Sequence, residues 1–282
     1  MEVEAACPSV WKAGGRKQMS NAATTWGVGD YPSMATHLRE AALAVVEAVE
    51  VAARDQVLDV ATGTGNAALL AAERGAEVVA VDFEPVLLQL ADTRARDMGL
   101  AVHWLEGDLE ALPVADDSAD VVVSVFGVMY AADHAAAARE LGRVARPGAR
   151  IALASWVPGS FMPGMGQVLS GYLPAPPASS GPPSRWGDSE VLPRLLENGG
   201  LRMVLSSQRR LALIFADAAA GAAFLIRTAG HVLSEQQRLT HTGRWEDLVD
   251  ELVAYVQQRA EALDGGLCLS LDYLLTTATS DS

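Results

Sequence analysis

Three acidic side chains stand where predicted strands end. Asp59 closes an apolar run just before a glycine-rich turn, Asp82 closes the next run, and Asp108 follows the third. The carboxyl ends of parallel strands meet at one edge of a sheet, where such sheets bind ligands, so we expect these carboxylates to converge. A carboxylate can accept hydrogen bonds from a cationic amino group, from ribose hydroxyls or from an adenine amino group. The three positions therefore favour a nucleoside that carries a positive charge.

The glycine-rich turn by itself fits two kinds of nucleoside. Gly63, Gly65 and Ala68 satisfy the loose dinucleotide pattern G-x-G-x-x-G/A, and Asp82 lies at a suitable distance along the chain for a ribose. A dinucleotide, however, would place its pyrophosphate over the turn, at the start of the following helix. Asp59 would then put a negative charge close to the phosphates, which costs about a few kcal/mol where solvation is poor. The pattern thus favours S-adenosylmethionine over a nicotinamide dinucleotide.

The composition excludes several other classes of function. The 282 residues carry 35 acidic and 21 basic side chains, and the net charge of −14 argues against nucleic acid as a partner. Cys7 and Cys268 are too few for a disulfide framework, and no metal-ligand spacing occurs, so no metal is expected. The N-terminus lacks the apolar segment of a signal peptide, and no apolar run is long enough to span a bilayer. We therefore expect a cytoplasmic protein that does not enter membranes.

Alternating strands and helices must position the carboxylates. Five short, mainly apolar runs are typical of buried strands, and segments with helical periodicity separate them. Such strands specify a parallel sheet that is covered on both faces. The expected fold class is α/β, a Rossmann-like doubly wound, mostly parallel sheet with an antiparallel last strand and a helical lid. The five runs are residues 56–60, 77–81, 101–105, 120–126 and 150–155.

The pattern changes after residue 156. Residues 201–215 indicate a strand, whereas residues 218–231 and 245–263 have helical periodicity. These changes divide the chain into parts that we expect to serve different purposes. The parts are an N-terminal cap over the nucleoside site (1–37), the nucleoside-binding core (38–155), an acceptor-binding lid (156–187 and 216–263), and the remaining sheet and helix of the core (188–215 and 264–282).

Five segments within residues 40–155 carry sequence motifs in a characteristic order. They read VLDVATGTGN at 57–66, VAVDF at 79–83, EGDLEALP at 106–113, ADVVVS at 119–124 and RVARPG at 143–148. In order and spacing they resemble the class I S-adenosylmethionine-dependent methyltransferases. The resemblance is closest to the ubiquinone/menaquinone-type branch, which also includes many natural-product methyltransferases.

The resemblance implies a role for each residue of the glycine-rich turn. Asp59, Gly63 and Gly65 would hold the methionine portion of S-adenosylmethionine, and Asp82 would hold its ribose. Ala61 departs from the family pattern, since many members have glycine there, but a small residue should still let the turn approach the ligand. Taken alone, Asp82 could instead cap the helix that follows its strand.

The resemblance also implies contacts to the rest of the cofactor. Phe83 would cover one adenine face, and Asp108 and Leu109 would contact the adenine. The backbone around Phe126 would contact the ammonium group of the methionine portion. Tyr31 could close over the sulfonium by a cation–π contact, or it could simply anchor the N-terminal segment through apolar packing.

Few residues are candidates for a general base, which assists transfer when the acceptor is a phenol, an enol or a protonated amine. His134 follows the fourth strand, near the place where the methyl group should project. Alternatively, Asp133 caps a helix and His134 lies in its exposed first turn. His37 ends the N-terminal cap and is a second catalytic candidate, while His231 and His241 flank the predicted lid helices.

The lid indicates the kind of acceptor. A large, apolar cover favours a small, hydrophobic organic molecule, so we expect methyl transfer to an oxygen or carbon of a quinol, phenol or polyketide-like natural product. Two alternatives stay open, namely an N-methyltransferase of an amino sugar or amino acid, and a cofactor-binding protein or cyclase without methyl transfer. The apolar face of residues 245–263 could also bury against a second copy, giving a homodimer. The lid side chains expected near the acceptor are Phe161, Met162, Met165, Trp186, Phe224, Ile226 and Trp245.

Overall fold

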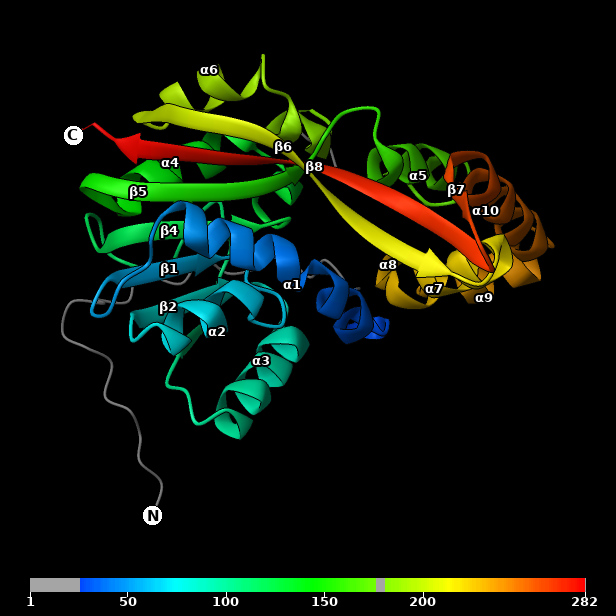
Figure 1. Ribbon diagram of the computed structural model, residues 1–282, viewed down its shortest axis with the longest axis horizontal. Coiled ribbons are helices and arrows are strands. Elements are labelled where there is room, and N and C mark those ends of the chain that lie inside the picture. Colours follow the sequence, from blue (N-terminus) through cyan, green and yellow to red (C-terminus); the bar gives the residue numbers. More distant parts are fainter. Residues whose placement is uncertain (1–25, 176–180, 282) are drawn as a thin grey trace.

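An eight-stranded mixed sheet carries helices on both faces and a helical lid at one end (Figure 1). The computed structural model describes residues 26–175 and 181–281, so residues 1–25 of the predicted N-terminal cap lie outside the described residues. The strand order is β3-β2-β1-β4-β5-β8-β6, with β7 paired to β8. Within the described ranges, no helix has the length and apolar character needed to cross a membrane. The predicted fold class is confirmed.

The first five strands form the parallel part of the sheet. Strand β1 lies between β2 and β4, and β3 and β5 extend the sheet on either side. Every residue of β1 is buried, because helices cover both faces, and this explains why the strand is apolar without alternation. The ends of β1, β2, β3 and β4 therefore lie side by side. The strands are β1 (Gln56–Val60), β2 (Glu77–Asp82), β3 (His103–Glu106), β4 (Ala119–Val125) and β5 (Ala145–Trp156).

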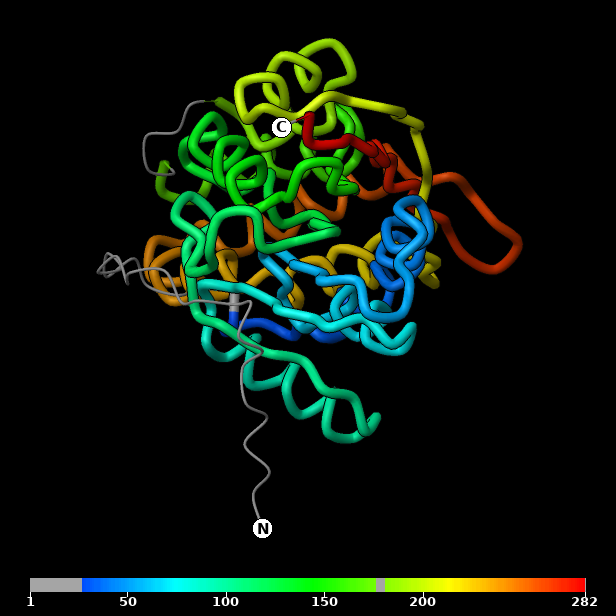
Figure 2. Tube along the Cα trace, turned by 90° about the vertical axis from the view of Figure 1, so that its left-hand side faces the viewer, coloured from blue at the N-terminus to red at the C-terminus, as the bar shows by residue number. Residues whose placement is uncertain are grey.

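Helices pack on each face of this sheet. Figure 2 shows α1 on one side and α4 on the other. Helix α1 packs on α2, β4 and β5, and α4 packs on α6 and β5. Asp133 caps α4 by accepting the amides of Ala135 and Ala136. The helices of the core are α1 (Tyr31–Ala48), α2 (Asn66–Glu73), α3 (Pro85–Asp97), α4 (His134–Val144) and α6 (Leu192–Glu197).

Two long strands connect the core to the lid. β6 (Leu201–Phe215) and β8 (Gly266–Ser280) pair antiparallel along their length. Strand β5 pairs only with the second half of β8, from Tyr273 to Thr279. The other half of this two-stranded ribbon continues past the core to the lid helices (Figure 1). The segments expected to complete the core therefore contribute to the lid as well.

The lid is built mainly from the chain between β6 and β8. The helix predicted over 245–263 ends at Arg259, and the residues after it pair with β8 as β7. Three 3-10 turns lie near the sites described below, namely η1 (Trp26–Val28), η2 (Val128–Tyr130) and η3 (Pro183–Gly187). The lid elements are α5 (Phe161–Ser170), α7 (Ala218–Thr228), α8 (Gly230–Leu233), α9 (Gln236–His241), α10 (Trp245–Arg259) and β7 (Glu261–Leu263).

The apolar face of α10 is covered within the chain. Leu248, Leu252 and Val256 are buried, and the helix packs against α5 and α7. From the sequence, this apolar face could also have packed against a second copy of the chain. Because the lid already buries it, it gives no support to a homodimer.

The start of α1 is tied to the lid. The N–H of Asp30 donates to the carbonyl of Arg227 at 2.9 Å, and the carboxylate of Asp30 pairs with the Arg227 guanidinium at 3.4 Å. The backbones at Gly29 and Gly230 lie close together, since a Cβ at Gly29 would come within 3.0 Å of the Gly230 nitrogen. This joint places Tyr31, the first residue of α1, beside the lid.

The close approach of α4 and the end of α6 can be tested with a matched pair of glycines. A Cβ at Gly142 in α4 would lie 1.7 Å from the carbonyl oxygen of Gly199, whereas a Cβ at Gly166 in α5 would meet nothing within 4 Å. We expect Gly142→Ala to lower the free energy of unfolding by about 1–3 kcal/mol or more. Gly166→Ala should raise it by up to about 1 kcal/mol, because alanine favours the helix.

Urea unfolding followed by circular dichroism measures both changes. Equal stability of the two variants would contradict the packing of α4 against α6.

Candidate active site

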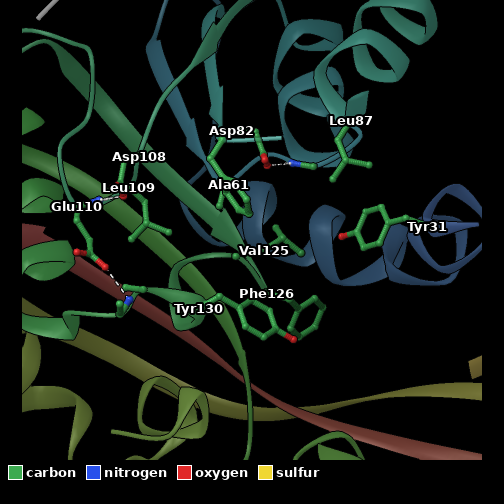
Figure 3. A pocket seen from close by; sticks show the side chains of 15 residues that line it. Tyr31, Ala61, Asp82, Leu87, Asp108, Leu109, Glu110, Val125, Phe126 and Tyr130 are labelled. Atoms are coloured by element: carbon green, nitrogen blue, oxygen red, sulfur yellow. Dashed lines mark hydrogen bonds between the residues drawn. The ribbon is translucent and has the colours of Figure 1, made fainter. Parts of the chain in front are cut away.

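A cavity of about 260 Å³ lies at the carboxyl ends of the parallel strands. Figure 3 shows Asp82, Asp108 and Glu110 in its wall. Among the described residues that line it there is no lysine or arginine. A cavity with carboxylates and no basic side chain suits a cationic ligand and disfavours phosphate. This cavity is called the donor cavity below, after the predicted methyl donor. Of the predicted binding residues, Asp59 and Gly65 do not line it. Those that do are Tyr31, Ala61, Gly63, Asp82, Phe83, Asp108, Leu109 and Phe126.

The carboxylate of Asp82 holds the turn after β1 against the end of β2. It accepts the N–H of Gly63 at 2.7 Å and the N–H of Glu84 at 2.9 Å, one on each oxygen. Burial raises the pKa of Asp82, and these two backbone hydrogen bonds oppose the rise. Each oxygen keeps a second lone pair, so the side chain can also accept two hydroxyl groups.

Asp59 lies beneath the turn and outside the donor cavity. One of its oxygens accepts the hydroxyl of Thr62 at 2.6 Å and the N–H of Ala68 at 2.9 Å. It borders a separate space of about 10 Å³, which Tyr31 also lines. Burial raises the pKa of Asp59 to about 7, although both hydrogen bonds oppose the rise. Asp59 therefore contacts the chain itself and can influence the donor cavity through its charge.

The turn needs backbone conformations that favour glycine. Ala61 and Gly63 have φ angles of 54° and 57°. The positive φ of Ala61 explains why many of the similar methyltransferases have glycine there. A Cβ on Gly127 would lie 2.4 Å from the Cβ of Ala61, so the chain after β4 can approach the turn only without a side chain. Arg94 supports the turn from outside by donating to the carbonyl and hydroxyl oxygens of Thr64.

The loop after β3 forms another wall of the donor cavity. Asp108 accepts the N–H of Glu110 at 2.9 Å, and Leu109 and Phe83 add apolar surface. Glu110 accepts the N–H of Ala132 at 2.6 Å, which joins this loop to the segment before α4. Sequence reasoning missed Glu110, although its place two residues after Asp108 was a signal.

A second cavity, of about 500 Å³, shares the wall formed by Tyr31, Phe126 and Tyr130 with the first. Phe126 has a φ of 57° and stacks on Trp156, with ring centroids 3.7 Å apart and planes 10° from parallel. Strained backbone of this kind is often found at functional sites. Tyr130 and Trp156 also line the second cavity, and sequence reasoning did not single them out. The signal that could have found them is that each follows a predicted strand, Tyr130 after 120–126 and Trp156 after 150–155.

The second cavity, called the acceptor cavity below, is mainly apolar. Met34, Met129, Met162 and Met165 contribute to it from the core and the lid. Flexible methionine side chains are well suited to the irregular surface of a hydrophobic ligand. Of the lid side chains expected near the acceptor, Met162 and Met165 line this cavity. The others belong to the hydrophobic core (Phe161, Trp186, Phe224 and Ile226) or, partly buried, pack against it (Trp245).

His134, predicted as a catalytic residue, lies outside both cavities, and we infer a structural role for it. It is 1 % exposed and lines neither cavity. Its Nδ1 accepts the indole N–H of Trp186 at 2.6 Å, so Nε2 carries the proton and donates to the carbonyl of Gly181 at 3.0 Å. Both ring nitrogens therefore make hydrogen bonds within the protein, away from the two cavities. The alternative was right that Asp133 caps α4 but wrong that His134 is exposed.

The other three histidines named above lie in different environments. His37 is exposed on α1, where its ring meets Phe224 edge-on at 5.3 Å, and it lines neither cavity. His241 is exposed at the end of α9. His231, in α8, lines the acceptor cavity. The one histidine at the acceptor cavity is thus one that the sequence did not favour.

The role of His134 can be tested through stability. We expect His134→Ala to lower the free energy of unfolding by about 1–3 kcal/mol, because the buried indole N–H of Trp186 loses its acceptor. His241→Ala, on the surface, should change it by less than about 0.5 kcal/mol. Thermal or urea unfolding measures the difference, and a His134→Ala protein of full stability would refute the structural role.

Comparisons with known proteins identify the family of this chain. Residues 58–153 match the methyltransferase domain family. The uncharacterized protein Rv1405c of Mycobacterium tuberculosis (strain ATCC 25618 / H37Rv) is 41 % identical over 179 residues, which are 62 % of this chain and 64 % of that protein. The chain thus spans less than two thirds of that relative's length. Demethylmenaquinone methyltransferase of Thermus thermophilus is 39 % identical over 164 residues, which are 50 % of this chain and 74 % of that enzyme.

The fold also matches solved structures. The YcgJ protein from Bacillus subtilis superimposes with a TM-score of 0.61 at 18 % identity, covering 86 % of this chain and 99 % of that one. At this identity the likeness concerns the fold alone. The family follows from the match to the methyltransferase domain and from the identity to the Thermus thermophilus enzyme over most of its length. The chain belongs to the class I S-adenosylmethionine-dependent methyltransferases, in the ubiquinone/menaquinone-type branch.

Proposed function

We propose that this chain transfers a methyl group from S-adenosylmethionine to an oxygen or carbon of a small, largely apolar acceptor. The wall shared by the two cavities is the observation that carries the proposal, since Tyr31, Phe126 and Tyr130 border both. Carboxylates line one cavity, and apolar side chains dominate the other. A cationic nucleoside and an apolar molecule bound in them would meet at this wall.

The residues of the donor cavity match the parts of the nucleoside. Asp82 would accept the ribose hydroxyls, Phe83 and Leu109 would pack on the adenine, and Asp108 would accept its amino group. The methionine portion would lie over the turn at Gly63. No basic side chain is needed for any of these contacts, in agreement with the described lining.

The chemistry requires positioning more than it requires reactive groups. S-adenosylmethionine supplies an electrophilic methyl carbon on a sulfonium. The protein must hold the nucleophilic atom of the acceptor about 3–3.5 Å from that carbon, in line with the breaking bond, and exclude water. The faces of Tyr31 and Tyr130 at the shared wall can attract a positive charge.

Other ligands match the cavities less well. The carboxylates of Asp82, Asp108 and Glu110 would repel a pyrophosphate, and no described arginine or lysine in the wall would compensate. An amino acid acceptor would need charged partners, but the described lining of the acceptor cavity includes no aspartate, glutamate, lysine or arginine. A cyclase would use the same two cavities, so only a transfer assay separates it from a methyltransferase.

That assay uses methyl-labelled S-adenosylmethionine with a panel of quinols, phenols, amino sugars and amino acids. We expect the label to reach a quinol or phenol, because the acceptor cavity is apolar and without formal charges in its described wall. Mass spectrometry of the product identifies the methylated atom. Label on an amine, or on no member of the panel, would contradict the proposal.

Donor binding provides the control. Asp82→Ala should weaken binding by at least about tenfold, because the variant loses charged acceptors and the anchor of Gly63. Asp97→Ala, an exposed change at the end of α3 that does not line the cavity, should leave affinity unaltered. Calorimetry measures both, and comparable binding of NADH would refute the choice of cofactor.

The raised pKa of Asp59 predicts that donor affinity depends on pH. In the free protein this carboxyl titrates near pH 7, and a bound cation should favour its ionised form. Binding then releases a proton, so affinity should rise about tenfold between about pH 6 and pH 8. Asp59→Asn keeps an oxygen to accept from Thr62 and Ala68 but does not titrate, so its affinity should be flat over this range.

Calorimetry in buffers of different ionisation enthalpy counts the released protons. An unchanged pH dependence in Asp59→Asn would show that another group is responsible.

A further inference from the structure

The acceptor cavity contains few titratable groups. Among the described residues in its wall these are Tyr31, Tyr130 and His231, and the remaining polar lining comes from amide and hydroxyl side chains such as Gln167 and Thr228. A tyrosine phenol ordinarily titrates near pH 10. For Tyr31, burial and the charges of nearby carboxylates raise the pKa further. At neutral pH both tyrosines are therefore hydrogen-bond donors, and His231 is the group of the described wall that can take up a proton.

The joint between the N-terminal segment and the lid fixes the position of His231. Helix α8 follows α7 directly and packs against η1. The hydrogen bond from Asp30 to Arg227 and the close contact of Gly29 with Gly230 hold the residues that directly precede His231. Tyr31 begins α1 at the same joint and borders both cavities. The same contacts thus place His231 in the acceptor cavity and Tyr31 in the wall that faces the donor.

The surroundings keep His231 in its neutral form. Burial lowers the pKa of its imidazole, which is the direction required of a base at neutral pH. Helix α8 packs against α7 and η1, where Arg227 of α7 pairs with Asp30 ahead of α1. Element η1 carries no titratable side chain. Tyr31 and Tyr130 are the other titratable groups facing the same cavity.

We propose that His231 is the general base of this site, and that the acceptor is an uncharged, apolar molecule whose acidic hydroxyl group, a phenol, enol or quinol, faces it. This inference rests on the proposed function. The absence of formal charges from the described wall excludes carboxylate and phosphate acceptors on electrostatic grounds. A neutral hydroxyl compound enters without an unpaired charge, and it acquires its negative charge only when the proton moves to His231.

The step balances without any further reactant. The O–H bond of the acceptor breaks, its proton passes to the imidazole, and its electron pair stays on the oxygen. That oxygen, or a carbon conjugated with it, forms the new bond to the methyl carbon. The C–S bond of the donor breaks at the same time, with its electron pair remaining on sulfur. The imidazolium then returns its proton to solvent.

A coloured phenol tests the proposal without methyl transfer. 4-Nitrophenol absorbs visible light only when ionised, so absorbance titration of the complex with S-adenosylhomocysteine reports its ionisation. In the native protein the bound phenol should ionise at lower pH than in His231→Gln, by at least about one pH unit, or tenfold in the ionisation constant. His241→Gln, the same change at an exposed position, should behave like the native protein.

Methyl transfer provides a second readout. With 4-methylphenol, which stays protonated at about pH 8, kcat should fall about 10²–10⁴-fold in His231→Gln. With 4-nitrophenol, which is already largely ionised at that pH, the loss should be less than about tenfold. Added imidazole should partly restore kcat in His231→Ala, a recovery that a merely structural histidine would not show.

Each outcome has one meaning. Equal ionisation of 4-nitrophenol in all variants, or equal loss of kcat with both phenols, would overturn the role of His231. Failure of the native protein to bind either phenol would overturn the acceptor class. A shift of ionisation that depends on His231, together with no label transfer to any acceptor, would overturn the proposed methyl transfer and leave the proton acceptor in place.

Discussion

Buried carboxylates that form no ion pair within residues 26–175 and 181–281 determine the character of the strand ends. Asp82 is 5 % exposed, and among the described residues its oxygens accept backbone N–H groups, including those of Gly63 and Glu84. Glu84 and Asp59 are buried nearby, and each adds negative potential. Native proteins usually pair such charges, because an isolated buried carboxylate is costly. Here the hydrogen bonds to the turn offset part of that cost, and a cationic ligand would offset more. The carboxylates around the turn thus favour a positively charged ligand.

The second constraint is the wall between the cavities. Its three side chains come from distant parts of the chain: Tyr31 from the start of α1, Phe126 from the end of β4 and Tyr130 from η2. Phe126 reaches the wall through a left-handed backbone, and its stacking on Trp156 holds the ring there. A reaction between two bound molecules needs such a place, where the cavities meet and water is displaced.

Local sequence predicted the parallel sheet well and the lid only in part. Apolar runs and the residues at their ends located Asp82 and Asp108, because the parallel topology turns position along the chain into position in space. His134 could not be placed in this way, since its burial depends on Trp186, 52 positions later. The residue pattern of 201–215 predicted the bounds of β6 correctly, but no feature of the neighbouring sequence indicated that this strand continues past the core. The last residues of 245–263 join β8 because a partner strand overrides weak helical periodicity.

The ribbon of β6 and β8 has a consequence for how such a protein can diversify. Phe215 and Leu267 are paired across the two strands, so the chain between them leaves and re-enters the sheet at one point. Its replacement by another segment of different length would remove the pairing of β7 with β8 but leave the ladder between β6 and β8 and the glycine-rich turn in place. New lid segments could therefore be acquired by insertion and recombination at this point, while the parallel strands and the glycine-rich turn of the core are retained.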